Sequence, residues 1–277
     1  MVHDDLGTRM KEFYEQVPKT KLVRRMPVII RIDGKAFHTF TRGFRKPFDH
    51  ILIKTMQETT KYLCENIQGC VFGFTQSDEI TLILVDYQKL TSSAWFDYEV
   101  QKLCSISASM ATMAFNKYFA ENVANEILEY KTSMVPQCVE IQQEIKEYHD
   151  TLRAAVNKGA MFDARCFNIP KEEVTNLIYW RQLDATRNSI QMVGQANFSH
   201  KELQNKTCNM IQDMLHEQKG INWNDYPTVC KRGSACIYTE YANMNGSHNS
   251  GWIIDKEMPI LKGEDRAYVD DLVYIGE

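Results

Sequence analysis

Two acidic positions interrupt segments that otherwise look like buried β-strands. The run "VIIRID" leads straight into Asp33-Gly34, and the apolar runs "CVFGFT" and "ITLIL" flank the acidic pair Asp78-Glu79. Carboxylates at the ends of apolar strands are unfavourable unless cations or hydrogen-bond donors meet them. Carboxylate oxygens are also ligands that Mg²⁺ prefers, together with water and substrate phosphates. These residues therefore indicate magnesium-assisted phosphoryl chemistry, provided that the fold brings them together.

Strand and helix signals alternate along the first 170 residues. Runs of β-branched and aromatic residues predict strands, and periodic apolar stripes predict long helices. In chain order we expect a short helix at 9–17, a strand at 28–33, a helix from Asp49 to Asn66, strands at 70–75 and 80–85, a helix at 95–122, a polar helical stretch at 123–158, and a fourth strand that Pro170 ends. The order β-α-β-β-α-β predicts an α+β fold with a ferredoxin-like core.

This topology predicts that the two acidic positions meet. In a β-α-β-β-α-β sheet the first and third strands are antiparallel neighbours, so Asp33 at the end of one lies beside Asp78 at the start of the other. Gly34 allows close approach of the backbone, so its carbonyl is a further candidate ligand. The alternative is that both acids shape turns, because Asp-Gly and "QSDE" suit turns. The convergence of the two acids favours a metal site formed by Asp33, Gly34 and Asp78.

From residue 171 onward the sequence is mostly helical in character. We expect a catalytic core at 1–170 and a mostly helical extension at 171–277, packed with the core as one unit. A helix from 171 to about 194 precedes another that Ser199 opens and Gly220 closes, and "CIYTEY" is the best strand of the tail.

Composition bounds the class of protein. With 44% hydrophobic residues, 25% charged residues and a net charge of −4, the chain is an ordinary globular protein. Between residues 19 and 54, however, ten Lys or Arg face two acids. Such an excess suits a polyanionic partner, but a solvated basic face explains it equally well.

The chain shows neither the apolar segment of a secretion signal nor a run of about 20 apolar residues that would span a membrane. Its eight cysteines are scattered, which favours a reducing cytoplasm over a secreted disulfide framework. The spacings Cys64/Cys70 and Cys230/Cys236 are wide for a zinc knuckle. We interpret them as core residues and keep a structural zinc as the minor alternative.

Several motifs together resemble one family. "RIDGKAFHTFTRGFRKPFD", "GFTQSDE", "MFDARCFNIP" and "YWRQLDATRNSI" resemble, in this order, the signature of the tRNA(His) guanylyltransferase family of 3′-5′ polymerases. The resemblance covers roughly residues 5–240. It implies a polymerase-type palm domain, two Mg²⁺ ions, ATP and GTP or other nucleoside triphosphates as substrates, tRNA as partner and a homotetramer.

The resemblance also implies roles for individual residues. Asp33, Gly34 and Asp78 would bind metal. The nucleotide would contact Asp33, Gly34, Lys35, Ala36, Phe37, His38, Ser77 and Asp78. Catalysis or triphosphate contact would involve Lys46, Ser77, Glu79 and Lys102, and tRNA would contact Arg181, Arg187 and Asn188. Each has a simpler alternative, namely surface lysines and arginines, a hairpin turn, and local packing of Phe37 and His38.

Two departures from the family pattern matter. Thr186 and Arg187 stand in "ATRNSI", where tRNA(His) enzymes carry a histidine-containing motif. This favours the guanylyltransferase-like branch, which is associated with repair of 5′-truncated tRNAs. Glu99 replaces an expected basic residue, and Arg45 or Lys61 are candidates to supply the missing charge.

The sequence therefore predicts template-dependent 3′-5′ nucleotide addition to the 5′ end of tRNA. The 5′-phosphate would be activated by nucleotidyl transfer and then attacked by the 3′-hydroxyl of an incoming nucleotide, with two metal ions. Three alternatives stay open at this point: a tRNA(His) guanylyltransferase proper, a palm-domain nucleotidyl cyclase or second-messenger synthase, and a catalytically silent tRNA-binding module. The intact "RIDG" and "QSDE" motifs argue against the last.

Overall fold

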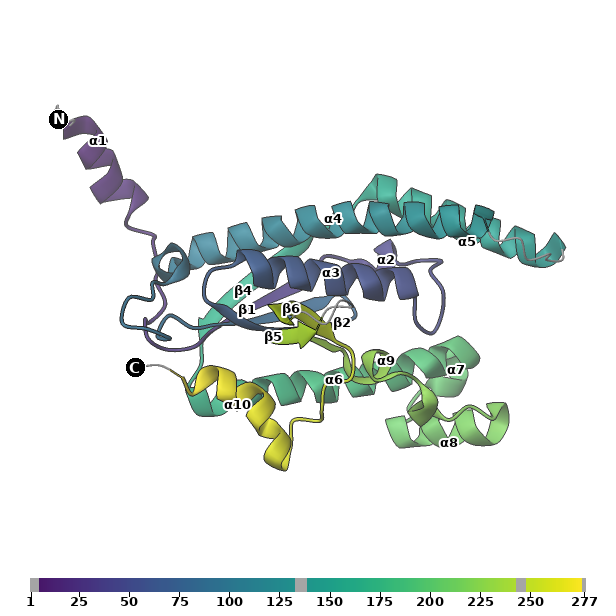
Figure 1. Ribbon diagram of the computed structural model, residues 1–277. Coiled ribbons are helices and arrows are strands. Elements are labelled where there is room, and N and C mark those ends of the chain that lie inside the picture. The colour runs from purple at the N-terminus through teal and green to yellow at the C-terminus, as the bar shows by residue number, and fades with distance from the viewer. Residues whose placement is uncertain (1–4, 133–138, 243–247, 276–277) are drawn as a thin grey trace.

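A six-stranded antiparallel sheet organises the protein, and the fold is α+β as expected (Figure 1). The structure is a computed structural model that describes residues 5–132, 139–242 and 248–275. The strands lie in the order β4-β1-β3-β2-β5-β6. Their bounds are β1 (Val28–Gly34), β2 (Cys70–Gln76), β3 (Glu79–Leu84), β4 (Phe162–Asn168), β5 (Ser234–Ala242) and β6 (His248–Asp255).

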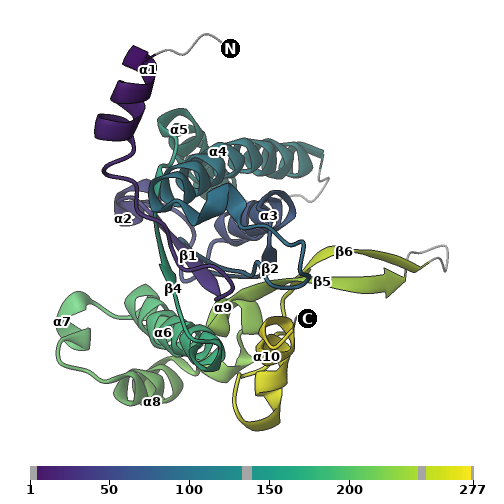
Figure 2. The same cartoon turned by 90° about the vertical axis from the view of Figure 1, so that its left-hand side faces the viewer.

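Helices cover both faces of the sheet (Figure 2). One face carries α3 (His50–Asn66), α4 (Val100–Thr132) and α5 (Val139–Lys158), and the other carries α6 (Lys171–Asn197) and α10 (Ala267–Val273). The alternation of side chains along β1 explains the two layers. Val28, Ile30 and Ile32 enter the core under α3 and α4, whereas Ile29 enters the core under α6 and α10. Arg31 and Asp33 follow Ile29 on the α6 side.

The first half of the chain follows the expected order. The predicted antiparallel neighbours β1 and β3 are confirmed. Asp49 is the N-cap of α3, and its carboxylate accepts the Leu52 N–H over 3.0 Å. The long helix differs from the prediction at both ends: α4 runs to Thr132, and it begins at Val100. Residues Trp95–Tyr98 form the separate turn η2, because Phe96 and Asp97 adopt positive φ angles of 49° and 51°.

The second half agrees with the prediction in its strands and corrects it in one helix. β5 matches "CIYTEY", β6 is a second strand of the tail, and both extend the sheet that the first 170 residues begin. The single helix expected from Ser199 to Gly220 is wrong. It is two helices, α7 (His200–Leu203) and α8 (Cys208–Lys219), because Asn205 adopts φ +62° and Thr207 opens a new helix by capping Met210.

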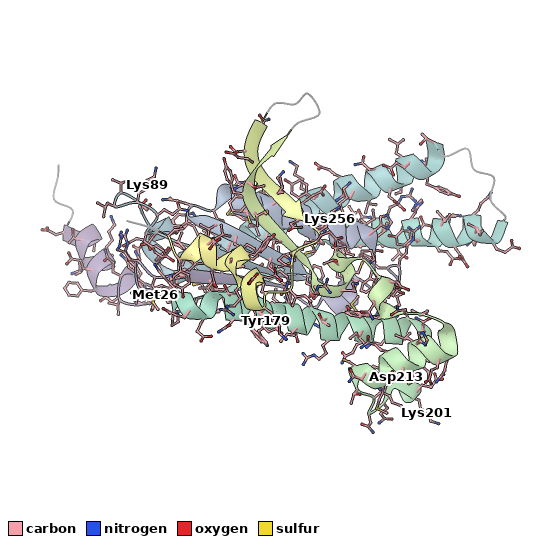
Figure 3. All side chains as sticks on the ribbon, turned by 60° about the horizontal axis from the view of Figure 1, so that its bottom comes forward. Met26, Lys89, Tyr179, Lys201, Asp213 and Lys256 are labelled. Carbon is pink, nitrogen blue, oxygen red and sulfur yellow. The ribbon has the colours of Figure 1, made fainter. Side chains whose placement is uncertain are left out.

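The two helices α7 and α8 form a lobe at the end of α6; Lys201 and Asp213 mark them in Figure 3. A separate apolar cluster joins this lobe to α6 through Ile190, Val193, Ile211, Leu215 and Trp223. The remaining short elements are α1 (Asp5–Met10), the π-helical turn η1 (Lys11–Glu15), α2 (Phe37–Phe40), η3 (Trp223–Asp225), α9 (Thr228–Arg232) and η4 (Gly263–Arg266).

Two further expectations concern membranes and zinc. None of the described helices is long and apolar enough to cross a membrane. Cys64 and Cys236 are buried in the core, as expected for small core residues. Within the described ranges, no group of three or more His, Cys, Asp or Glu side chains is arranged to bind a metal. The described cysteines thus offer no ligand set for a structural zinc.

Candidate active site

Asp33 and Asp78 meet at one edge of the sheet, as the topology predicts. Asp33 pairs with Glu79 in the register of β1 and β3, and the Gly34 N–H donates to the carbonyl oxygen of Asp78 over 3.1 Å. The turn between β2 and β3 consists of Ser77 and Asp78, with Ser77 at φ +54°. A tight two-residue turn fixes the hairpin register, so the position of Asp78 beside the end of β1 is determined by the backbone.

The two carboxylates are electrostatically strained. Burial, together with the neighbouring charge of Asp33, raises the pKa of Asp78 to about 6. Burial and the charges of Glu79 and Asp163 raise the pKa of Asp33 as well. A cation between the two carboxylates would relieve both effects. The chemistry of these donors therefore fits a hard divalent cation.

Magnesium commonly binds one or two carboxylates and completes its shell with water, backbone oxygens and substrate phosphates. Asp33, Asp78 and the carbonyl of Gly34 are the groups that could supply such ligands here. Among the described residues, no third Asp, Glu, His or Cys side chain joins them in a metal-binding group. A bound triphosphate would therefore be needed to complete the shell, as in many nucleotide enzymes.

A cavity of about 520 Å³ has Asp78 in its wall. Asp33 and Lys35, which the sequence also predicted at the nucleotide, are not among its lining residues. Seven of its lining residues belong to the predicted site, namely Gly34, Ala36, Phe37, His38, Lys46, Ser77 and Asp78. The sequence did not single out Thr41, Phe44, Pro47, Asp49, Leu52, Met192 and Gln195, and it proposed Arg45 only as a substitute cation. Met192 and Gln195 come from α6, so the second half of the chain contributes one wall.

The close approach of the Phe37 ring to the backbone requires a glycine at position 34. A Cβ atom on Gly34 would lie 2.2 Å from Cδ2 of Phe37. Phe37 is buried and packs on the rings of Phe40, Phe115 and Phe162. The ring thus belongs to the core and holds α2 against the end of β1. The suggestion that Phe37 packs locally is confirmed, although its ring also reaches the cavity wall.

A buried network fixes the basic loop at the cavity. The Asp49 carboxylate accepts hydrogen bonds from the Arg45 N–H (3.1 Å) and from the Tyr148 hydroxyl (2.8 Å). The Arg45 guanidinium lies 4.1 Å from the centroid of the Tyr148 ring and 3.4 Å from Glu126. Because α5 supplies Tyr148, that helix positions the loop that brings Arg45 and Lys46 to the cavity.

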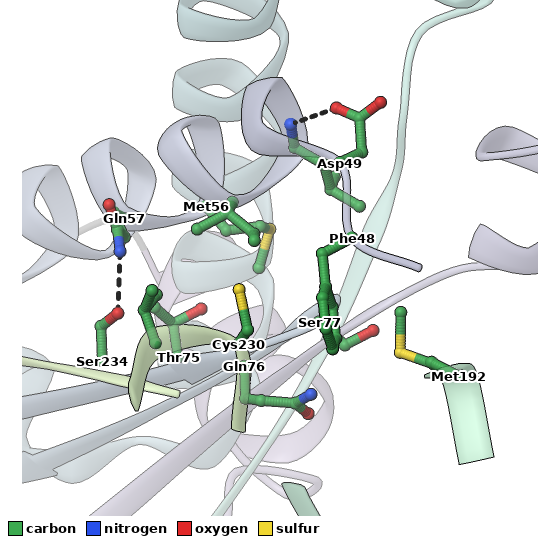
Figure 4. Close-up of a pocket in the computed structure, with 13 residues that line it drawn as sticks. Phe48, Asp49, Met56, Gln57, Thr75, Gln76, Ser77, Met192, Cys230 and Ser234 are labelled. Atoms are coloured by element: carbon green, nitrogen blue, oxygen red, sulfur yellow. Dashed lines mark hydrogen bonds between the residues drawn. The ribbon is translucent and has the colours of Figure 1, made fainter. Parts of the chain in front are cut away.

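A smaller recess of about 60 Å³ opens beside the main cavity (Figure 4). The two share Asp49, Leu52, Ser77 and Met192. Phe48 and Met192 lie at its Ser77 side, and the Gln57 amide donates to the Ser234 hydroxyl over 2.8 Å at its other end. β5 supplies Ser234, so the extension also shapes this part of the site.

Glu79 and Arg181 form an ion pair that the sequence did not predict. Arg181 is 5% exposed, and its guanidinium donates over 2.7 Å to both Glu79 and Asp184. Arg31 lies 3.4 Å from the same Glu79 carboxylate. Arg181 therefore links α6 to the catalytic hairpin, which accounts for its burial; as a contact for tRNA it would first have to leave two carboxylates.

The remaining predicted residues do not line the cavity. Arg187 is exposed and pairs with Asp184, and Asn188 follows it on α6. The Lys35 side chain is exposed, while its N–H donates to the carbonyl of Met161. Lys102 lies in the first turn of α4, 3.9 Å from Glu99, and is not among the residues that line the cavity. Glu99 itself is buried.

A sheet edge with two aspartates, and a cavity there lined by Asp78, Arg45 and Lys46, suit the chemistry of a nucleotidyltransferase. The sequence model of the Thg1 family, described as tRNAHis guanylyltransferase, matches residues 7–170. This is more than half of the chain, and the chain belongs to that family.

Solved structures agree over nearly the whole length. A bacterial tRNA(His) guanylyltransferase (Thg1)-like protein in complex with ATP is 41% identical, with a TM-score of 0.79 over 98% of this chain and 100% of its own. Such a protein in complex with GTP is 40% identical, with a TM-score of 0.74 over the same shares. The tRNA(His) guanylyltransferase of Saccharomyces cerevisiae is 25% identical over 75% of this chain and 80% of its own length.

Proposed function

We propose that this enzyme adds nucleotides in the 3′-5′ direction to the 5′ end of tRNA, that the opposing strand directs the addition, and that the reaction repairs 5′-truncated tRNAs. The observation that carries the proposal is that Asp33 and Asp78 lie at the same sheet edge, and that Asp78, Arg45 and Lys46 line one cavity there. The likeness to bacterial Thg1-like proteins solved with ATP and with GTP supports a nucleoside triphosphate as the occupant.

The sheet supports a polymerase-type palm. The strands β4-β1-β3-β2, connected as β-α-β-β-α-β, have the order of a ferredoxin-like core. Asp33 and Asp78, with the carbonyl of Gly34, would hold two Mg²⁺ ions. When bound, these ions would lower the pKa of the attacking hydroxyl and offset charge on the triphosphate.

The proposed reaction has two steps. First, an oxygen of the tRNA 5′-monophosphate attacks the α-phosphorus of ATP and releases pyrophosphate; a 5′-triphosphate would make this step unnecessary. Second, the 3′-hydroxyl of the incoming nucleotide attacks the 5′-phosphorus of the tRNA and releases the activating group. Arg45 and Lys46 would stabilise the negative charge that develops on the phosphoryl oxygens. Asp49 and Tyr148 hold their loop in place.

The opposing base would select the incoming nucleotide by Watson–Crick pairing. The motif "ATRNSI", which lacks the histidine of the tRNA(His) enzymes, supports this repair role over guanosine addition to tRNA(His). Exposed Arg187, together with Asn188, is our proposed tRNA contact on α6. We also propose a homotetramer, in which subunits share one L-shaped RNA, and a cytoplasmic location.

The test is to incubate the enzyme and Mg²⁺ with a tRNA that lacks its first 5′ nucleotide and all four nucleoside triphosphates, and to sequence the product. We expect extension that matches the opposing base. Guanosine added whatever the opposing base would instead identify a tRNA(His) guanylyltransferase. A cyclic product without RNA would identify a cyclase, and tRNA binding without incorporation would identify a binding module.

A further inference from the structure

The N-terminal helical arm carries an apolar stripe that its own chain does not cover. Leu6, Met10, Phe13, Tyr14 and Val17 are 59%, 42%, 66%, 66% and 72% exposed, and α1 and η1 contain no buried residue. At α-helical spacing Leu6, Met10, Phe13 and Tyr14 would share one side of a helix, and Val17 follows directly after the helical turns. The arm points away from the body of the protein in both ribbon views (Figures 1 and 2).

Such an arm requires a partner surface. Isolated helices shorter than about 12–15 residues are marginal in water, and most helical stability in proteins comes from packing of the apolar face. The helical part of the arm, Asp5–Glu15, is within that limit. The five exposed large apolar side chains of the arm therefore indicate that something packs against it.

The outer face of α4 has the complementary character. Ser105–Asn116 contains no charged residue, although Ser105, Ser109 and Met113 are exposed. Exposed Met113 (54%) and Met161 (60%) line a groove of about 420 Å³, whose floor includes Ala108 and Thr112. Interface cores are depleted of charge and enriched in methionine, and small residues let a helix approach closely.

The root of the arm is attached to the N-terminal end of the helix that carries this face. Thr20 and Leu22 form backbone hydrogen bonds with Val100 and Tyr98, at the start of α4. The arm then leaves the body, so its stripe does not reach the groove on its own α4. In a second copy, however, the groove is open to such an arm, and an exchange of arms between two copies related by a two-fold axis is isologous and closes on itself.

We propose that the arm of one copy packs its apolar stripe into the α4 groove of a second copy, and that the exchange is reciprocal. This inference concerns assembly, goes beyond the nucleotide chemistry, and is tested without activity. It has a consequence for the site. Met161 in the groove wall accepts the Lys35 N–H, and Phe162 pairs with Gly34 and packs on Phe37. A docked arm would therefore lie next to the segment that lines the cavity.

The first test measures the mass of the intact protein in solution by light scattering over a concentration series. Phe13→Asp in the stripe and Met113→Asp in the groove should each weaken self-association at least about tenfold, because either change places a charge in an apolar contact. Glu12→Gln, on the other side of the arm, should leave the mass unchanged. Glu12, Phe13 and Met113 are all exposed, so the variants should fold. Circular dichroism would check this.

The second test locates the contact in the otherwise unchanged protein. A photo-crosslinking amino acid at position 13, in a mixture of ¹⁵N-labelled and unlabelled chains, should give mixed-isotope crosslinks to peptides of residues 105–116. Crosslinks within one chain, crosslinks to another surface, or Asp variants with unchanged mass would overturn the proposal. Binding of the arm to anionic lipid vesicles, lost in Phe13→Asp while the mass stays constant, would overturn it in favour of a membrane anchor.

Discussion

The N–H of Gly34 donates to the carbonyl oxygen of Asp78 over 3.1 Å, and this hydrogen bond joins the ends of two strands that lie more than forty residues apart in the chain. The same hydrogen bond brings the Asp78 backbone to the end of β1, where Asp33 lies, and the charge of Asp33 contributes to the raised pKa of Asp78. Both carboxyls have raised pKa values, which is unfavourable for the folded chain alone. Such local cost is typical of a site shaped for a ligand.

This cost predicts that Asp78→Asn stabilises the metal-free protein at pH 7. The folded state holds the Asp78 proton with a pKa of about 6, against 3.8 in the unfolded chain. The folded wild type therefore gains stability relative to the unfolded chain as the pH falls from above 6 towards 4. The melting temperature of Asp78→Asn should exceed that of the wild type at pH 7, and this difference should become smaller as the pH falls from above 6 towards 4. A variant that melts below wild type at pH 7 in EDTA would contradict the assignment.

Divalent cations should stabilise the wild type through the same pair. With a nucleoside triphosphate present at constant concentration to complete the metal shell, Mn²⁺, used as a probe for Mg²⁺, should raise the melting temperature by mass action in a concentration-dependent way. Asp33→Asn and Asp78→Asn should lose this shift, while Asp213→Asn on the distant helix α8 should keep it. Equal shifts in all four proteins would mean that the ion binds elsewhere.

Gly34→Ala should disrupt the site through Phe37. The new methyl group would overlap the Phe37 ring, which is buried and cannot turn away freely. We expect a loss of about 1–3 kcal/mol in the free energy of unfolding, as for other overpacked positions, measured by urea denaturation. Gly34→Ala/Phe37→Leu should lose less than the sum of the two single changes, since the smaller side chain relieves the overlap. Additive losses would argue against this contact.

Two arginines of α6 provide a matched pair for the ion-pair network. Arg181→Met should destabilise the protein by about 3 kcal/mol, because it leaves Glu79 and Asp184 without their shared partner in a largely buried position. Arg187→Met removes an exposed partner of the same Asp184 and should cost less than about 1 kcal/mol. Conversely, Arg187→Met should reduce the free energy of tRNA binding by more than it reduces the free energy of unfolding. Equal stability of the two variants would contradict the role given to Arg181.

Local patterns were sufficient for the parts of the fold that depend on neighbouring residues. The β-branched run before Asp33 and the Pro47-Asp49 signal predicted β1 and the start of α3, and the strand order then brought Asp33 to Asp78. Glu79, the partner that joins Arg181 to the hairpin, lies 102 residues away in the chain, and the nearby Asp184 alone does not distinguish a buried arginine from a surface one. Met192 and Gln195 reach the cavity only because α6 packs across the sheet, which no local pattern encodes.

The most direct measurement of the central claim uses four truncated tRNAs that differ only in the base opposite the missing 5′ nucleotide. With Mg²⁺ and all four nucleoside triphosphates, the wild type should add the complementary nucleotide to each, and Asp33→Asn and Asp78→Asn should add none while remaining folded. If the added nucleotide does not change with the opposing base, or if both variants retain the activity, the account of a metal-dependent, template-directed 3′-5′ polymerase is wrong.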